Sequence, residues 1–356
     1  MGIDAARLLH SFEALLGVRA PSGEEAPLRR LLETRLQALG FAVRQDARGN
    51  LCGVRRGEGE PVLLCAHMDT VPLAAEPHVV SDAWGYRTDG STALGADNRA
   101  GVAVILEALE AAETRSAEVL FTVEEERALA GSREADLSGL RARCALVPDS
   151  SRDVGTVVLQ TPTKVHVGID VCGRAAHAAL APASGVSAIR VAAMAVAELP
   201  GPELPEGVTF NIGSFCAEGP TNVVCDHAAL EAEARAFDEA ALEALLARVR
   251  DVFERHAAAA GATCRWRQRM DYRGYRVLPD EPAVQRFRAA CRRAGVPFAA
   301  ASSMGGSDAN HLVRAGIVPL VMGVGAKHPH AVEECISRES LASAARLVEQ
   351  FLLGDV

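Results

Sequence analysis

Hydrophobic residues near the start of the chain recur with the spacing of an amphipathic helix. Leucines and one phenylalanine recur every three or four positions in residues 4–16, and leucines do so again in residues 28–39. Ser22 and Glu25 have the spacing of a capping box ahead of the second segment, and Gly40 provides a stop after it. The pattern therefore predicts two amphipathic helices.

Short, continuously apolar runs follow at residues 62–66, 119–123, 144–147 and 317–322. Strands that are buried on both faces of a parallel sheet have this composition. A helix expected at residues 99–112 separates the first two runs. This alternation predicts an α/β fold with a mostly parallel sheet between layers of helices.

The middle of the chain has a different pattern, in which apolar and polar residues alternate from position 164 onward. Strands are expected at 165–171, 208–216, 228–237 and 263–270, and helices at 185–199 and 239–260. This β-α-β-β-α-β order is typical of a ferredoxin-like α+β unit whose antiparallel sheet is open on one face. We therefore expect an inserted domain at 163–272, within a discontinuous domain formed by 1–162 and 273–356.

Composition narrows the class of protein. The chain has 356 residues, which is more than a single hydrophobic core usually contains, so two domains are expected. Its net charge of −9, without a basic stripe, argues against nucleic-acid binding. No apolar stretch approaches the roughly 20 residues of a membrane span. The odd count of 9 Cys without a Cys-x-x-Cys pair, together with a start unlike a signal peptide, predicts reduced thiols and a cytoplasmic protein.

Polar side chains follow each of the four apolar runs, and one more lies in the loop before the 99–112 helix. In chain order these residues are His67 and Asp69, Asp97, Glu124–Glu126, Asp149 and His330. The carboxyl ends of parallel strands meet at one edge of a sheet, where ligands bind in open α/β folds. We therefore expect these groups to converge.

Imidazoles and carboxylates without thiolates suit zinc, cobalt or manganese in a site that keeps a position open. Two histidines and three or four acids are too many for one tetrahedral ion, but they suit two ions that share a carboxylate and hold a hydroxide between them. Taken singly, His67 and Asp69 fit an ordinary strand-end pair, and Asp97 fits a helix N-cap. Their coincidence at one sheet edge favours the metal centre. Asp69 is placed to orient the His67 ring.

Seven stretches stand out, and five of them carry these residues. The seven are HMDTVP at 67–72, LGADNRAG at 94–101, FTVEEE at 121–126, VPDS at 147–150, GRAAHAA at 173–179, GGSDANH at 305–311 and KHPHAVEE at 327–334. In their order they resemble the co-catalytic zinc peptidases, a family that includes peptidase T, carboxypeptidase G-type enzymes, acetylornithine deacetylase and succinyl-diaminopimelate desuccinylase. The resemblance covers nearly the whole chain and is greatest to the peptidase T-like aminopeptidases.

This resemblance implies a catalytic domain with two divalent ions per chain, zinc in the first place and cobalt or manganese as alternatives. His67 and Asp149 would bind one ion, Glu126 and His330 the other, and Asp97 would bridge them. The inserted domain would serve as a lid and a dimerisation domain.

The other matched positions imply roles in catalysis and substrate binding. Glu125 would act as general base, and Asp69 would orient His67. The positions matched to the substrate pocket or the reaction oxyanion are His177, Arg235, Gly305, Gly306 and Ser307.

Departures from the family pattern bear on the register of the site. Asn98 stands where many members have a second Asp, and its amide can still serve as a neighbour of the bridging residue. The acidic run has three members, and the residues that flank it select Glu125 as base and Glu126 as ligand. The acidic pair that follows favours His330 over His328.

The expected function is hydrolysis of an amide bond in short peptides, as in tripeptide aminopeptidases. An N-acyl amino-acid deacylase or carboxypeptidase of the same family is the alternative, and a catalytically silent metal- or peptide-binding homologue is the alternative from another class. A serine or cysteine nucleophile is disfavoured, because the chain has no Gly-x-Ser-x-Gly elbow. Free edges of the inserted sheet favour a homodimer through that domain.

Overall fold

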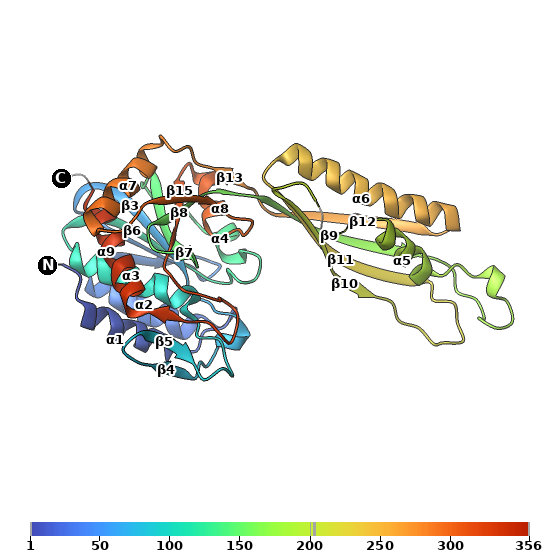
Figure 1. The fold of residues 1–356 in the computed structure, drawn as a ribbon, viewed down its shortest axis with the longest axis horizontal. Coiled ribbons are helices and arrows are strands. Elements are labelled where there is room, and N and C mark those ends of the chain that lie inside the picture. Colours follow the sequence, from blue (N-terminus) through green and yellow to red (C-terminus); the bar gives the residue numbers. More distant parts are fainter. Residues whose placement is uncertain (1, 200, 202–203, 355–356) are drawn as a thin grey trace. The chain divides into compact units, whose positions relative to one another are not determined.

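The computed structural model describes residues 2–199, 201 and 204–354, which fold into two compact units. The first unit contains residues 2–160, 275–303 and 307–354, and the second contains residues 161–274 and 304–306 (Figure 1). Within these described ranges, no helix is both long enough and apolar enough to cross a membrane.

The first unit is built on a large mixed sheet whose central strands are parallel. The central order is β6 (Arg115–Thr122), β3 (Glu58–His67), β7 (Cys144–Ser150) and β15 (Val318–Gly323). These strands contain the four apolar runs, so the predicted parallel α/β sheet is confirmed. The flanking strands are β1 (Ala42–Gln45), β2 (Leu51–Arg55), β8 (Thr156–Thr161), β13 (Tyr275–Arg276) and β14 (Ala299–Ser302).

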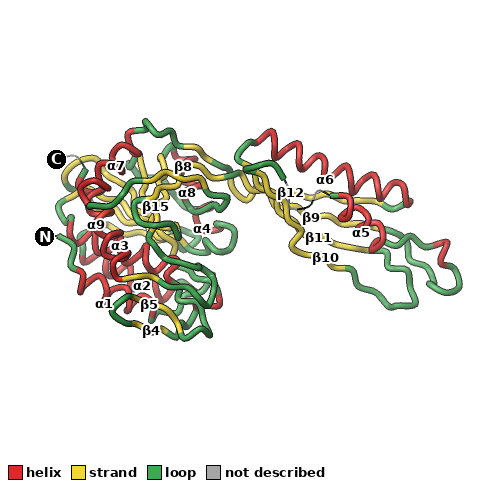
Figure 2. Tube along the Cα trace, viewed as in Figure 1, coloured by secondary structure: helices red, strands yellow, loops and turns green. Residues whose placement is uncertain are grey.

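Helices pack around this sheet and against one another (Figure 2). They are α1 (Ala5–Leu16), α2 (Ala26–Ala38), α3 (Ala96–Ala111), α4 (Ala130–Glu134), α7 (Pro282–Ala294), α8 (Ala309–Leu312) and α9 (Arg338–Leu353). α3 lies on β3 and β7, and α1 and α9 cover α3. Nearly all of α3 is therefore buried, which explains its apolar sequence. A small separate sheet contains β4 (Val79–Ser81), β5 (Gly85–Thr88) and β16 (Ile336–Ser337).

One local prediction, the capping box before α2, is wrong. The N-cap of α2 is Glu25, and its side chain makes no capping hydrogen bond. The Ser22 hydroxyl instead donates to the buried carboxylate of Asp69 at 2.6 Å, and the Glu25 carboxylate accepts from the backbone amides of Gly23 and Glu124. Distant partners thus outcompete the local pairing that the sequence spacing suggested.

The second unit has the ferredoxin-like order that the alternation predicted. Its elements are β9 (Thr163–Cys172), α5 (Ala188–Glu198), β10 (Val208–Cys216), β11 (His227–Ala236), α6 (Glu239–Ala260) and β12 (Thr263–Tyr272). The antiparallel sheet has the order β10-β11-β9-β12, and α5 and α6 bury its apolar face. The other face carries polar cross-strand contacts, such as the ion pair of Lys164 with Glu233 at 3.1 Å and the hydrogen bond of His166 with Glu231 at 2.8 Å.

Candidate metal centre

The five residues predicted as metal ligands come together in the first unit. His67 ends β3, and Asp149 lies near the end of its neighbour β7. Asp97 lies at the start of α3, and Glu126 follows β6. His330 lies in the segment between β15 and β16, with a left-handed φ of 64°. The parallel sheet therefore gathers at one edge groups that are more than 260 positions apart in the chain.

Asp97 lies between two sets of donor atoms. Its Oδ1 is 3.0 Å from Nε2 of His67, and its Oδ2 is 3.3 Å from Nε2 of His330. The same nitrogen of His67 is 3.4 Å from Oδ1 of Asp149, and that of His330 is 2.7 Å from Oε1 of Glu126. One carboxylate thus faces two histidine–carboxylate pairs, one on each of its oxygens.

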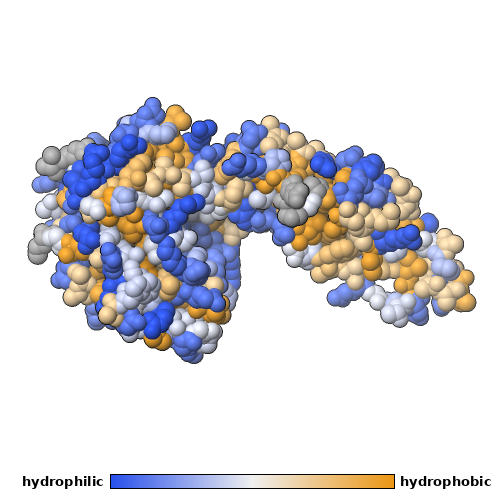
Figure 3. Space-filling view, in the orientation of Figure 1, coloured by the Kyte–Doolittle hydropathy of each residue, from blue (hydrophilic) through white to orange (hydrophobic). Residues whose placement is uncertain are grey.

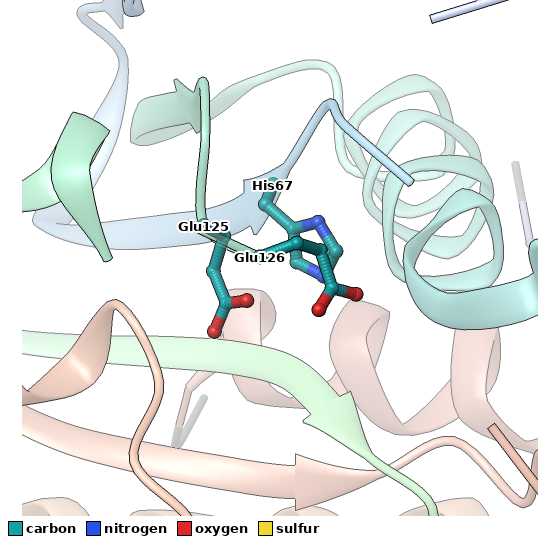
Figure 4. A group of neighbouring side chains, drawn as sticks. All are labelled: His67, Glu125 and Glu126. Carbon is teal, nitrogen blue, oxygen red and sulfur yellow. The ribbon is translucent and has the colours of Figure 1, made fainter. Parts of the chain in front are cut away.

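The side chains of the acidic run Glu124–Glu126 point in different directions. Glu124 has a φ of 49° and pairs with Arg48 and with Arg127, the latter at 3.2 Å. Glu125 and Glu126 lie with His67 in a group whose candidate ligand atoms are within 4.8 Å of one another (Figure 4). The first acid is therefore neutralised by arginines, and the other two are left for the site.

Asp69 holds this acidic loop as well as the histidine. The Nδ1–H of the His67 ring donates to the backbone carbonyl of Asp69 at 3.0 Å, while the Asp69 carboxylate is 3.4 Å away. The carboxylate oxygens accept the amides of Glu125 at 3.0 Å and Glu126 at 3.1 Å, and the Ser22 hydroxyl. With Nδ1 protonated, the neutral ring presents Nε2 as its electron-pair donor.

Two further side chains position the ligands, and for Glu334 the sequence predicted no such role. Glu334, which is buried, accepts the backbone amides of Gly95 at 2.7 Å and Asp97 at 3.0 Å, and so fixes the loop that presents Asp97. The amide of Asn98 donates to Oδ1 of Asp149 at 2.6 Å, in line with its expected role as a neighbour of the bridging residue. The only sequence signal for Glu334 was its place in the last motif.

Hydrogen bonds, burial and neighbouring charges shift the pKa values of several side chains in the site. Hydrogen bonds with Asp97 and Glu126 raise the pKa of His330 to about 10. Burial disfavours the charged form of His67, but Asp149 and neighbouring acceptors outweigh it and raise the pKa of the ring. Burial raises the pKa of Asp149 to about 7 and that of Glu125 well above its usual range. The site thus attracts positive charge at two positions, one on each side of Asp97.

This donor set fits two divalent cations. The candidate ligand atoms form the groups His67–Asp97–Asp149 and Asp97–Glu126–His330, each within 4.8 Å, and the two groups share Asp97. Each group offers one imidazole nitrogen and two carboxylates, which suits zinc, cobalt or manganese with positions left for water and substrate. Among the described residues, His328 belongs to neither group.

The predicted substrate residues lie mostly in the second unit. His177 is exposed, and Arg235 donates to the carbonyl of Met304 at 3.0 Å and to Glu233 at 2.8 Å. Gly305 and Gly306 belong to the same unit, where a side chain at Gly306 would collide with the Tyr272 ring. Ser307 is buried in the first unit. Their substrate roles stay predictions.

Comparison with known proteins agrees with this geometry. The sequence pattern of Peptidase family M20/M25/M40 matches residues 63–354. The uncharacterized protein YqjE of Bacillus subtilis strain 168 is 32% identical over 363 residues, covering 97% of each sequence. A tripeptidase structure from Staphylococcus aureus has a TM-score of 0.94 and 31% identity, over 99% of this chain and 98% of the other. The structure of aminopeptidase PepT from Bacillus cereus has a TM-score of 0.90 and 31% identity, over 98% of both chains.

Substitution of the shared carboxylate is expected to affect both ions, because it removes an oxygen from each donor set. After equilibration with zinc and removal of excess metal, elemental analysis should find two ions per wild-type chain. Asp97→Ala should lose most of both, and His67→Ala and His330→Ala should each lower the occupancy. His78→Ala, at an exposed histidine that contacts Asp89, should keep both ions. Saturation of the wild-type protein at one ion would contradict the shared-carboxylate centre.

Proposed function

Because this chain belongs to the peptidase family M20/M25/M40, we propose that it is a peptidase T-like aminopeptidase that hydrolyses tripeptides with a free N-terminus. The observation that carries the proposal is the position of Asp97 between two histidine–carboxylate pairs. The similarity to the tripeptidase and to aminopeptidase PepT, each over at least 98% of both chains, supports the choice of substrate class.

The proposed reaction needs a Lewis acid and a proton carrier. When bound, two divalent ions polarise the scissile carbonyl and lower the pKa of a water molecule. His67 and Asp149 would hold one ion, Glu126 and His330 the other, and Asp97 both. Glu125 takes a proton from the attacking water and delivers it to the amide nitrogen as the carbon–nitrogen bond breaks. Asp69 keeps the His67 ring and the backbone of Glu125 in place.

We assign His177 to stabilisation of the reaction oxyanion or of a substrate carboxylate. Its Nδ1 accepts the backbone amides of Ala179 at 3.2 Å and Leu180 at 3.1 Å, so the neutral ring carries its proton on Nε2, as a donor requires. Arg235 and the Gly305-Gly306-Ser307 loop are assigned to the substrate pocket. Support for Arg235 acting with this loop is its hydrogen bond to Met304, the residue that precedes the loop.

The remaining assignments are coarser. Zinc is the proposed resident metal, because imidazole and carboxylate donors with open positions are typical of catalytic zinc sites. Cobalt and manganese are the alternatives. A cytoplasmic location is proposed from the odd number of cysteines, 9, without a Cys-x-x-Cys pair.

We also propose a homodimer formed through the second unit. β10 is an edge strand of its sheet, and such edges are normally covered or paired. Apolar side chains of this unit are exposed: Phe215 by 41% on β10 itself, and Ile189 by 44% and Met194 by 50% on α5. Figure 3 shows apolar residues on the surface of this unit. Pairing of two β10 edges across a two-fold axis would cover this edge.

A hydrolysis panel tests the substrate class. With zinc, cobalt or manganese present, tripeptides with a free amino terminus should be cleaved fastest. N-acetyl amino acids should be slow, because they lack the free terminus that the proposed pocket recognises, and dipeptides in the same panel show whether a third residue is needed. Product release is followed by chromatography. Preference for N-acetyl amino acids would instead assign the chain to the deacylase branch, and the absence of any hydrolysis would favour a catalytically silent homologue.

Glu125→Gln should separate catalysis from metal binding. The amide keeps the size of the side chain but cannot take a proton, so the rate should fall by roughly 10²–10⁴-fold while both ions stay bound. Glu126→Gln should lower metal occupancy as well as rate. Parallel measurement of kcat and of metal per chain distinguishes the two. If the Glu125 variant loses metal and the Glu126 variant keeps it, the assignment of base and ligand along the acidic run is wrong by one residue.

The dimer is tested with a charge on each edge of the second sheet. Light scattering during size-exclusion chromatography should give a dimer mass for the wild-type protein. Phe215→Glu should shift it toward the monomer, because it places a charge on the β10 edge of each chain. Met270→Glu is the matched control, since Met270 is 46% exposed but lies on β12, at the opposite edge. A wild-type monomer at all concentrations, or equal dissociation of the control, would contradict the β10 interface.

A further inference from the structure

The acidic loop that carries Glu125 and Glu126 leaves the sheet at a defined point. Thr122 is the last residue of β6 that pairs with β3, and its carbonyl accepts the amide of Met68 at 2.7 Å. Beyond it, the backbone amides no longer belong to the ladder. Backbone N–H groups near the core need acceptors, because an unpaired one costs as much as a lost hydrogen bond.

Side-chain oxygens from three separate segments bind the next four amides in succession. The amide of Val123 donates to Oδ1 of Asn50 at 3.0 Å, and that of Glu124 donates to Oε1 of Glu25 at 3.0 Å. The amides of Glu125 and Glu126 donate to the two oxygens of Asp69. We call these three side chains, Asn50, Glu25 and Asp69, the amide cradle. Each of them is buried.

Within the cradle, Glu25 was predicted only as part of a capping box, which it does not form, and the proposed mechanism gives it no role. Its Oε1 also accepts the amide of Gly23 at 2.8 Å, so one oxygen joins the turn before α2 to the acidic loop. The side chain of Glu124 points elsewhere, to Arg48 and Arg127, so the link to the loop runs through the backbone alone. The same turn also anchors Asp69 through the hydroxyl of Ser22.

We propose that Glu25 is a positioning residue, which fixes the backbone of the acidic loop so that Glu125 and Glu126 point into the metal centre. This inference rests on the proposed function for its catalytic consequence. The physical basis is that one buried oxygen accepts two backbone amides, and a buried N–H left without an acceptor is costly. A loop with one such anchor removed can shift, and a misplacement of about 1 Å can cost on the order of 10²-fold in rate.

The decisive comparison is between Glu25→Ala and Glu25→Gln. Alanine removes the acceptor, whereas glutamine keeps an oxygen where Oε1 accepts both amides. Glu24→Ala is the matched control, because Glu24 is exposed and pairs with Arg19. Hydrogen exchange by mass spectrometry, on protein without added metal, reports the loop itself. Peptides that cover residues 122–127 should exchange faster in Glu25→Ala than in the wild type, and Glu25→Gln and Glu24→Ala should match the wild type.

Kinetics on the zinc-loaded enzyme then test the consequence. Glu25→Ala should lower kcat by about tenfold or more, with KM changed by less than about twofold, because the loop carries the base and a ligand. Glu25→Gln should restore kcat to near the wild-type value. If Glu25→Ala does not fold, Glu25→Asp, which withdraws the oxygen by one methylene, should change exchange and kcat in the same directions.

Three results would overturn the proposal. They are unchanged exchange in Glu25→Ala, faster exchange with unchanged kcat, and a loss in Glu25→Gln as large as that in Glu25→Ala. If the wild-type protein hydrolyses no peptide, the proposed function fails. The exchange experiment then still decides whether Glu25 holds the loop.

Discussion

The Asp69 carboxylate is the group on which the rest of the candidate site depends. It is fully buried, and its oxygens accept the hydroxyl of Ser22 and the amides of Glu125 and Glu126. Burial opposes its ionisation, but His67 and these hydrogen bonds outweigh that effect and hold the pKa of Asp69 below its usual range. An ionised carboxylate without hydrogen-bond partners would be very costly in the interior. Movement of Ser22 or of the acidic loop away from Asp69 is therefore disfavoured, and the carboxylate holds both in place.

A buried cation completes this arrangement. Arg99, in the first regular turn of α3, donates to the carbonyls of Met68 and Val18 and is attracted by Asp69 and Glu25. Burial lowers the pKa of Arg99 to about 10. The carbonyl of Met68 lies between His67 and Asp69 in the chain, so this arginine holds the end of β3 from the other side. Turn, strand end and acidic loop are thus joined by charged hydrogen bonds.

Features that arise from periodic patterns could be predicted from the sequence. The four central strands have uninterrupted apolar runs because both of their faces are buried, and this pattern alone predicts that His67 and Asp149 lie at one edge of the sheet. The alternation in the second unit likewise predicted its order of elements. The family resemblance supplied the expected pairing of ligands.

Contacts between distant segments could not be predicted in this way. Glu25 bonds to the amide of Glu124, 99 positions away, and Glu334 to that of Asp97, 237 positions away. Neither partner is a side chain, so no residue type marks the contact. The capping-box spacing of Ser22 was misleading because its hydroxyl has a buried carboxylate within reach. The strands β4, β5 and β16 are too short to give a periodic signal.

We propose that Asp97 is shared between two metal sites, one on each of its carboxylate oxygens. Anomalous X-ray diffraction at the zinc edge, from crystals of the wild-type protein grown with zinc, tests it most directly. Two anomalous peaks per chain are expected, one among His67, Asp97 and Asp149 and the other among Asp97, Glu126 and His330. A single peak, or two peaks of which only one contacts Asp97, would contradict it.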